Sequence, residues 1–288
     1  MKVKVLFLVI TVFIISCSKK ELDNDLNQLN LKGNIVSIKE YWHKIDENNK
    51  YRIIENDSSL SYEYKFNKDG YLLFKNLLIY SDSIETSYFE YDSLNRKIHE
   101  IEYTKPRYTY YCKYKAKYHY PNDSVIVKEY YYNHGMGDEK NSIRFDTIEL
   151  NKNKIINIKI YDYTNSIRSI ENFEYDKFKN KKNRVYSSFD LDNKMKKWVI
   201  NNYKYDSKNN LIHIQSINPQ TKKVNFNYYC YYNKNNDLQK TIENSSTGKE
   251  IRTFKYVYDN MNNWVLRETF ESDKLIFVDT RKIIYSNQ

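Results

Sequence analysis

The sequence predicts an all-β fold, built as a long antiparallel β-meander of repeated hairpins. One hairpin pattern recurs along most of the 288 residues. No long stretch shows a 3.6-residue apolar stripe, and β-branched and aromatic residues dominate the apolar runs. The pattern is clearest in residues 203–214, YKYDSKNNLIHI. Two rings at i and i+2 share one face of a strand, an Asp closes the strand, an Asn-rich turn follows, and an apolar strand leaves.

An acidic or amide residue closes the first strand of each unit, and these residues recur every 25 to 30 positions. They are Asn67, Asp92, Asn122, Asn151, Asp176, Asp206, Asn233 and Asp259. About eight units, with an opening strand in residues 31–44 and closing strands in residues 275–285, predict roughly sixteen to nineteen strands at typical lengths.

Six of these residues have a predicted structural role in their turns, because a carboxylate or amide oxygen at a strand end accepts hydrogen bonds from nearby backbone. They are Asn67, Asp92, Asp176, Asp206, Asn233 and Asp259. A ladder of carboxylates one unit apart does not provide the close pair that acid/base catalysis requires.

Asparagine takes the turn role that glycine and proline usually fill, since the chain has only 5 Gly and 3 Pro. Asn tolerates a positive φ better than most residues. We therefore expect left-handed backbone at or beside the residues that match Gly70 in their units. These are Asn95, Asn180, Asn209, Asn235 and Asn262.

The sheet is expected to curl. Polar residues alternate with the rings in the first strand of most hairpins, which indicates one buried and one solvated face. Sheets of more than about ten strands rarely stay open and flat. The meander is therefore expected to form either a solenoid or a barrel-like closure, and residues 31–288 are expected to form one repeat domain.

Residues 1–16 have the composition of an export signal. Two lysines precede an apolar run in residues 5–15, which is shorter than the about 20 residues that span a bilayer. Residues 14–17, Ile-Ile-Ser-Cys, resemble a bacterial lipobox, the site where a signal is cut before a cysteine that receives lipid. The resemblance implies that Cys17 is the acylated first residue of the mature chain.

Residues 17–30 are polar and are expected to serve as a lipid-anchored tether. Ser18 after the cysteine favours the outer membrane, by analogy with other bacterial lipoproteins. We expect the protein at the outer membrane or cell surface, and the sequence leaves open whether it faces the periplasm or the exterior.

The aromatic-x-Tyr-Asp units are similar to the YD repeats of Rhs-type proteins. The opening of the repeat domain, residues 31–40, looks like the start of many uncharacterised Bacteroidetes-type lipoproteins. This chain has Asn where Rhs units usually carry Gly after the turn, as at Asn95. The resemblance implies β-hairpin repeats on an envelope protein and transfers no activity.

The formal charge of +10 falls to +8 when the two signal lysines are removed. Basic residues are interleaved with acidic ones and form no long run, so no nucleic-acid partner is expected.

Cys112 and Cys230 remain after lipidation of Cys17, and a disulfide between them would require the sheet to roll up.

Catalytic and metal motifs are not found in the sequence. The five histidines have no metal-ligand spacing, and neither a phosphate loop nor a nucleophile elbow is present. The loop at residues 134–138, HGMGD, differs from the other turns, which are rich in Asn and Lys, because it combines two glycines with potential ligands. It is the one loop that is a candidate for a binding or metal site. We expect no enzyme, cofactor or metal, and keep a glycan-active enzyme as an alternative because glycosidase carboxylates have no local signature.

The aromatic content, 31 Tyr, 13 Phe and 3 Trp, is the most specific remaining feature. Rings held on a rigid strand make a platform for sugars or partner proteins. The candidate contact residues are Trp42, Tyr110, Tyr131, Trp198 and Trp264. We expect a lipid-anchored, non-enzymatic protein-interaction module of the envelope, with a glycan-binding lipoprotein or an immunity-type protein as alternatives.

Overall fold

The computed structural model of the chain describes residues 24–44, 60–79, 82–105, 111–132, 142–151, 154–162, 164, 166–178, 180–189 and 194–286. The described part holds one short helix, α1 (Asp25–Gln28), and 18 strands. The signal segment and Cys17, the proposed acylation site, lie outside the described residues, as do Tyr110 and residues 134–138.

The strands in chain order are β1 (Ile35–Lys44), β2 (Leu60–Phe66), β3 (Leu72–Ile79), β4 (Asp82–Tyr91), β5 (Lys97–Thr104), β6 (Tyr111–Asn122), β7 (Val125–Tyr132), β8 (Ser142–Asn151), β9 (Lys154–Asp162), β10 (Ile167–Tyr175), β11 (Lys181–Phe189), β12 (Met195–Tyr205), β13 (Leu211–Ile217), β14 (Val224–Tyr232), β15 (Leu238–Ser245), β16 (Gly248–Tyr258), β17 (Trp264–Glu271) and β18 (Lys274–Tyr285).

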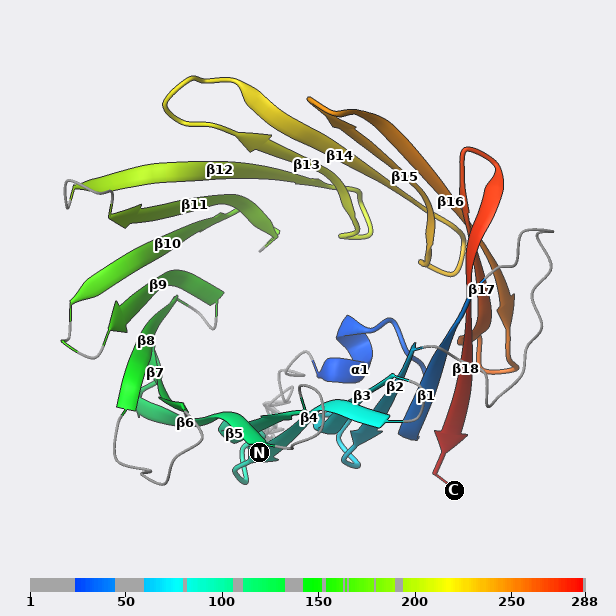
Figure 1. The fold of residues 1–288 in the computed structure, drawn as a ribbon, viewed down its shortest axis with the longest axis horizontal. Helices are drawn as coiled ribbons and strands as arrows, with labels where there is room; N and C mark the ends of the chain where they lie inside the picture. The colour runs from blue at the N-terminus through cyan, green and yellow to red at the C-terminus, as the bar shows by residue number, and fades with distance from the viewer. Residues whose placement is uncertain are drawn as a thin grey trace, which may run out of the picture.

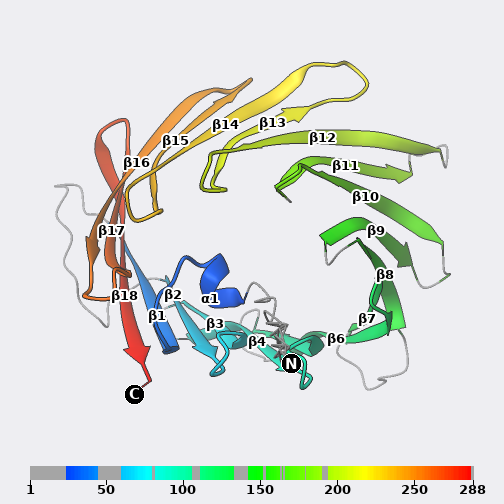
Figure 2. The ribbon, with the colours of Figure 1, turned by 180° about the vertical axis from the view of Figure 1, so that it is seen from behind.

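The sheet closes on itself and forms a barrel. Each strand pairs antiparallel with its neighbours in the chain, and β1 pairs with both β2 and β18. Figure 1 shows the strands as a ring, and Figure 2 shows the same ring from behind. The predicted antiparallel β-meander is confirmed, and of the two expected forms the chain adopts the barrel and not the open solenoid.

Alternation along the strands separates the side chains that face the lumen from those that face outward. α1 lies inside the ring (Figures 1 and 2), and its Leu26 belongs to the same apolar cluster as Ile38 of β1. Ile38 pairs with Tyr64 of β2 and with Ile283 of β18. Cross-strand partners share a face and alternate residues change face, so the register assigns each paired residue to the lumen or to the outside.

The Asx residues hold the hairpin turns with their own side chains. Oδ1 of Asp206 accepts hydrogen bonds from the backbone N–H groups of Lys208, at 2.8 Å, and Asn210, at 2.9 Å. Equivalent pairs of bonds form at the other five positions to which the sequence assigned a turn role. They reach Asn67, Asp92, Asp176, Asn233 and Asp259.

The left-handed residue stands three positions after the Asx residue in five of these six turns. It is Gly70 in the first unit, and it is Asn95, Asn209 and Asn262 where we expected them, all with positive φ. In another unit the residue is Asn236, the neighbour of the expected Asn235. In the turn after Asp176, the expected Asn180 stands four positions after the Asx residue and does not have a positive φ, and the residue at the third position lies outside the described residues.

Tyrosine hydroxyls tie five of the hairpins to the hairpin before them. The Tyr232 hydroxyl donates to the carbonyl oxygen of Leu211 at 3.0 Å, where the second strand of the preceding hairpin begins. The same connection is made by Tyr91 to Leu72, Tyr120 to Lys97, Tyr175 to Ile155 and Tyr256 to Leu238. A phenylalanine would bury similar apolar area but leave these carbonyl groups without this donor, which explains the preference for Tyr.

Replacement of Asp206 with Ala should lower the free energy of unfolding by about 1 kcal/mol, because two backbone N–H groups lose their acceptor. Asp206→Asn keeps an oxygen in the same place and should cost less than half of that. Thermal unfolding followed by far-UV circular dichroism measures both variants. Equal losses would mean that the charge of Asp206, and not its oxygen, supports the turn.

Candidate functional site

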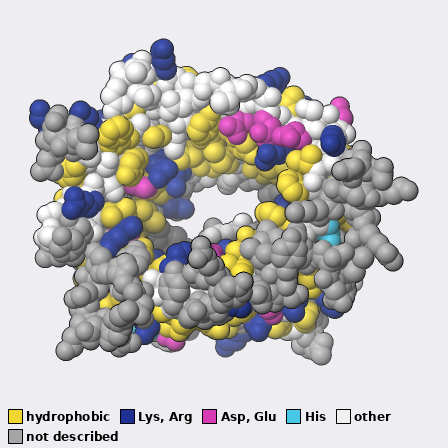
Figure 3. Space-filling model, in the orientation of Figure 1, with side chains coloured by type: hydrophobic (Ala, Val, Ile, Leu, Met, Phe, Trp, Pro, Cys, Tyr) yellow, Lys and Arg dark blue, Asp and Glu magenta, His cyan; other side chains and the backbone are white. Residues whose placement is uncertain are grey.

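The barrel is hollow, and its inner wall is the candidate site. Figure 3 shows an opening at the centre of the ring, bordered by apolar and charged side chains. Within the described residues, no helix has the length and apolar character needed to cross a membrane. The lumen-facing side chains gather into two charged clusters and one aromatic stripe.

The first cluster lies across the seam at which β1 and β18 join. Nε of Arg281 donates to Oε2 of Glu40 at 3.0 Å, and both side chains are about nine-tenths buried, with exposures of 10% and 11%. Arg267 binds Oδ2 of Asp279 at 2.8 Å on the neighbouring strand. The Arg281 guanidinium also stacks on Trp264, with its carbon 3.4 Å from the ring centroid. We call these five residues the seam cluster.

Burial dominates the electrostatics of the seam cluster. It lowers the pKa of Arg281, although the carboxylate of Glu40 opposes the change. It also raises the pKa of Asp279, even though Arg267 donates a hydrogen bond to that carboxyl. Each charge is therefore held in the wall by its partner, because a buried ion without one is strongly disfavoured. The cluster can serve as a fixed, locally balanced polar patch on the lumen.

An aromatic stripe continues from this cluster along the barrel. Trp42 lies 6.1 Å from Tyr62 and 6.4 Å from Phe277, measured between ring centroids. Tyr62 in turn stacks on Tyr64 at 6.0 Å. Phe277 is 45% exposed, and the register places all four rings on the lumen face. The stripe is therefore a row of rings on the inner wall, in which Phe277 is the most exposed, Lys75 lies over the ring of Tyr62, and Tyr64 packs against the apolar cluster of α1.

The second cluster is centred on Glu100 of β5. The hydroxyls of Tyr114 and Tyr118 donate to its two oxygens at 2.6 and 2.5 Å, and Lys128 donates at 3.2 Å. Lys128 also lies 4.5 Å from the ring centroid of Tyr130 and 5.1 Å from that of Tyr118. We call these residues the Glu100 cluster.

The Glu100 carboxylate is stabilised in its ionised form. Burial alone would oppose ionisation, but the hydroxyls of Tyr114 and Tyr118 and the ammonium of Lys128 outweigh it and lower the pKa of Glu100. Burial and the hydrogen bond to Glu100 raise the pKa of both tyrosines. A carboxylate with a lowered pKa and satisfied oxygens is a poor proton donor, so the cluster has the character of a structural wall element.

The candidate contact residues fall in different surroundings. Trp42 lies in the stripe, whereas Trp264 is only 6% exposed beneath Arg281. Trp198 is 43% exposed and its indole N–H donates to the carbonyl oxygen of Ser188. Tyr131 faces outward opposite Lys115 of β6, and burial together with Glu129 raises its pKa to about 12.

Sequence reasoning did not find Glu100, Lys128, Glu40 or Arg281. Each charged residue sits in an ordinary alternating strand, and its partner is on another strand. The pairing of Glu40 with Arg281 spans 241 residues of sequence. Only Lys128 had a nearby sequence feature that could have indicated its cluster, because the run of tyrosines at residues 130–132 begins two positions after it.

Two other sequence questions are answered by the described residues. Cys112 and Cys230 do not form a disulfide with each other, and the register places Cys112 on the outer face and Cys230 on the lumen face. Closure of the sheet was not sufficient to bring them together. Among the described residues, no group of three or more His, Cys, Asp or Glu side chains could hold a metal ion.

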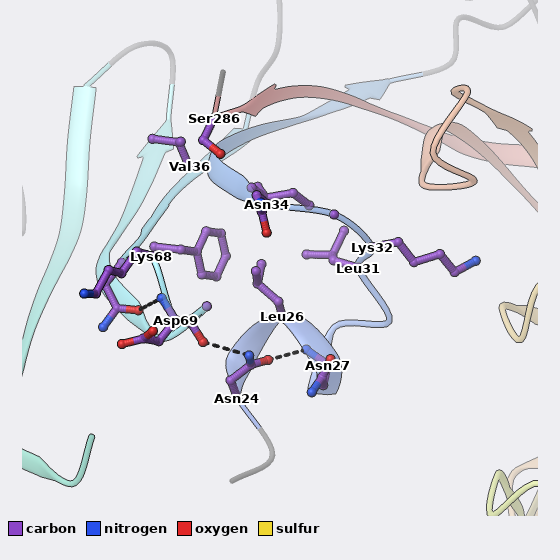
Figure 4. Close-up of a pocket in the computed structure, with 15 residues that line it drawn as sticks. Asn24, Leu26, Asn27, Leu31, Lys32, Asn34, Val36, Lys68, Asp69 and Ser286 are labelled. Atoms are coloured by element: carbon purple, nitrogen blue, oxygen red, sulfur yellow. Dashed lines mark hydrogen bonds between the residues drawn. The ribbon is translucent and has the colours of Figure 1, made fainter. Parts of the chain in front are cut away.

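A pocket of about 780 Å³ lies between α1 and the ends of β1 and β2 (Figure 4). Its polar lining is used by the protein itself: Asn24 donates to the carbonyl oxygen of Asp69 at 2.8 Å and accepts from the N–H of Asn27 at 2.9 Å. Leu26 and Leu31 fill its apolar side. We interpret the pocket as the place where the N-terminal segment packs against the barrel.

The outer wall carries a separate groove of about 640 Å³ over β3, β4 and β5. Three rings border it: Phe74 and Tyr88 lie 5.3 Å apart, and Tyr88 and Tyr103 lie 6.2 Å apart. Tyr88 is 46% exposed. At the floor, the hydroxyl of Thr86 donates to the side-chain oxygen of Asn76 at 3.0 Å.

No protein-family model matches the chain, and the search of curated proteins found no significant match. The chain is similar in structure to a porin-like protein from Bacteroides uniformis, with a TM-score of 0.47 and 11% identity over 88% of this chain and 98% of the other. A porin-like protein from Bacteroides vulgatus has a TM-score of 0.22 and 9% identity, covering 88% and 100% of the two chains.

A third similar structure is the TcdB2-TccC3-Cdc42 complex, with a TM-score of 0.22 and 10% identity. The match covers 85% of this chain and only 17% of that one. The described residues form an 18-stranded barrel, which is similar to these porin-like proteins of Bacteroides. The YD-repeat likeness expected from the hairpin motif has no matching family model.

Replacement of Glu100 with Gln should lower the free energy of unfolding at neutral pH by on the order of 2 kcal/mol, because charge-assisted hydrogen bonds are lost. A carboxyl with a lowered pKa stabilises the fold above its unfolded-state pKa and loses that contribution as the pH falls through its folded-state pKa. The difference in the free energy of unfolding between wild type and Glu100→Gln should therefore become smaller at acidic pH. Denaturant unfolding at several pH values measures it.

The matched control is Glu90→Gln. Glu90 is 63% exposed and pairs with His99 on the outer face at 2.8 Å. An exposed pair of this kind contributes about 0 to 1 kcal/mol. A Glu100 variant no less stable than the Glu90 variant would show that the Glu100 cluster does not support the wall.

Proposed function

We propose that this protein is a lipid-anchored, non-enzymatic binding module of the bacterial envelope that receives a glycan chain in its lumen. The observation that carries the proposal is the aromatic stripe of Trp42, Tyr62, Tyr64 and Phe277 on the inner wall of a hollow barrel. Ring faces pack against the C–H faces of sugars, and neighbouring polar groups bind sugar hydroxyls.

The charged clusters support binding rather than catalysis. Glu40 and Asp279 are each held by an arginine, and Glu100 is held by two hydroxyls and a lysine. Acid/base catalysis of glycoside cleavage uses two carboxyl groups with separated protonation states on either side of the bond. These carboxylates instead serve as fixed polar borders beside the rings.

Outward-facing lysines support attachment by a lipid rather than by strands embedded in a bilayer. The register places exposed lysines on the outer face within strands, and they are Lys39, Lys65, Lys117, Lys204, Lys255 and Lys282. A lysine facing lipid at the bilayer midplane costs about 2 to 4 kcal/mol. The proposed location is the outer membrane or cell surface, with Cys17 as the acylated residue.

A protein partner is the second candidate, and the outer groove favours it. Phe74, Tyr88 and Tyr103 present rings to solvent around a hydrogen-bonded polar floor. Exposed aromatic residues of this kind are enriched at protein interfaces. In this alternative the barrel acts as a rigid support and its outer wall makes the contact.

The glycan proposal predicts a change in tryptophan fluorescence when polysaccharide enters the lumen. Wild type should respond, and Trp42→Ala should bind about tenfold more weakly, the loss typical of one central aromatic contact. Trp198→Ala is the matched control, since its exposed indole lies away from the stripe and should leave the affinity unchanged.

A flat titration across a broad polysaccharide panel would contradict the glycan proposal. A crosslinked pull-down from intact cells then separates the alternatives. Recovery of a stoichiometric protein partner that is lost in Tyr88→Asp would select the outer groove.

The anchor is tested by Cys17→Ala. If the lipid holds the protein to the membrane, the variant should no longer carry acyl chains, and metabolic labelling with a fatty-acid analogue should give no signal. Wild type, in which several acyl chains hold the mature chain firmly, should label and remain with the membrane through alkaline or high-salt washes. Labelling of the Cys17→Ala variant would show that acylation occurs elsewhere.

A further inference from the structure

The six Asx turns all lie at one end of the barrel. Each of them follows the first strand of a hairpin, and in an antiparallel meander these first strands run in the same direction. They connect β2 to β3, β4 to β5, β10 to β11, β12 to β13, β14 to β15 and β16 to β17. We call this end the turn rim.

Three of these turns expose an apolar side chain at the same position, two residues after the Asx residue. Leu94 is 62% exposed, Phe178 is 65% exposed and Met261 is 41% exposed. The position requires no apolar residue, since its backbone N–H makes the turn contact and other units have Asp69, Lys208 or Asn235 there. The terminal methyl of Met261 lies against Gly33 of the N-terminal segment, but the fold does not explain the apolar tips at Leu94 and Phe178.

Exposed lysines stand in four of the six turns of the turn rim, beside one exposed aspartate, Asp69. The lysines are Lys68, Lys177, Lys208 and Lys234. The Asx carboxylates of the rim bind their own backbone, as Asp92 and Asp259 do, and so are turned inward from the tips. Apolar side chains mixed with lysines on one face are typical of surfaces that bind the interface of an anionic bilayer.

The N-terminal segment is fastened to this same rim. The N–H of Leu26 donates to the carbonyl oxygen of Gly70 at 3.2 Å in the first turn, beside the Asn24 contact drawn in Figure 4. Asn30 donates to Asp237 at 2.9 Å after the β14–β15 turn. The chain therefore enters the described structure at the turn rim, tied to turns on two parts of the ring.

The length of the tether then limits how far the turn rim can lie from the bilayer. Cys17 precedes Asn24 by seven residues. Seven residues, fully extended, span at most about 25 Å. If Cys17 carries the lipid, as in the proposed function on which this step rests, the bilayer surface cannot be farther than that from the turn rim.

We propose that the turn rim is a membrane-docking surface for a bilayer with anionic headgroups. Leu94, Phe178 and Met261 insert at the interface, and the lysines lie among the headgroups. The lipid on Cys17 and the rim act as two signals that together hold the barrel upright. The opposite end of the barrel then faces away from the bilayer and admits the ligand.

The orientation is tested on the acylated full-length protein in vesicles. A fluorophore is attached to Ser207→Cys in a turn of the rim or to Ser246→Cys at the opposite end, both exposed serines, in a background with Cys112 and Cys230 replaced by Ser. Vesicles contain phosphatidylcholine, phosphatidylglycerol and a headgroup spin-labelled lipid. Quenching at position 207 should exceed that at position 246 at least threefold.

The apolar tips are tested by combining Leu94→Ser, Phe178→Ser and Met261→Ser, which should reduce quenching at position 207 at least twofold. The matched control replaces three apolar residues of similar type near the opposite end with Ser, and it should not change the signal. These residues are Phe189, Met195 and Val224, with exposures of 37%, 38% and 46%. Circular dichroism verifies that both triple variants keep their β-sheet.

Three outcomes would overturn the proposal. Equal quenching at both ends with the protein bound to vesicles would refute the docking surface and leave the lipid anchor intact. Equal effects of the two triple variants would refute the role of the apolar tips. Protein that does not sediment with vesicles would refute the anchor, and with it the reach of the tether on which the orientation depends.

Discussion

The hydrogen bonds between β1 and β18 determine whether this chain has a lumen at all. They join the two ends of the repeat domain over a register that runs from Ile35 with Tyr285 to Lys44 with Phe277. Without them the meander would present two unpaired edges, which are sites of non-specific association. The same seam holds the buried pair of Glu40 with Arg281, so the pairing that closes the sheet also forms the polar patch of the lumen.

The unusual composition follows from two repeated contacts within this closed sheet. A side-chain oxygen of an Asx residue receives two backbone N–H groups in each of six turns, which allows Asn to replace most of the glycine that hairpins normally require. A tyrosine hydroxyl then reaches the carbonyl oxygen of the preceding hairpin, as Tyr232 does at Leu211. These contacts hold six turns and join five hairpins to the hairpin before them, so the abundance of Asn and Tyr has a structural cause.

Local features were readable from the sequence because their physics is local. The Asp206 turn, the left-handed Asn209 and the β-hairpin class all depend on residues within five positions of one another. Closure depends instead on how strand number and stagger add up around the ring. The Glu40–Arg281 contact forms only when the sheet closes. Trp264 was a predicted ligand-contact residue, but the structure buries it beneath the guanidinium of Arg281. Charged residues in alternating strands have no local mark that distinguishes a buried wall pair from a solvated face.

The aromatic stripe runs along the barrel from one end towards the other. β1 begins at the turn rim and ends at the opposite rim, so Trp42 lies two residues from the end of the strand at that opposite rim, whereas Tyr64 lies nearer the turns. The short Asx turns and α1 occupy the turn rim. A ligand that enters from the other end meets Phe277 and Trp42 before it reaches Tyr62 and Tyr64. The row of rings therefore leads from the opposite rim towards the N-terminal segment, as a path for an elongated ligand would.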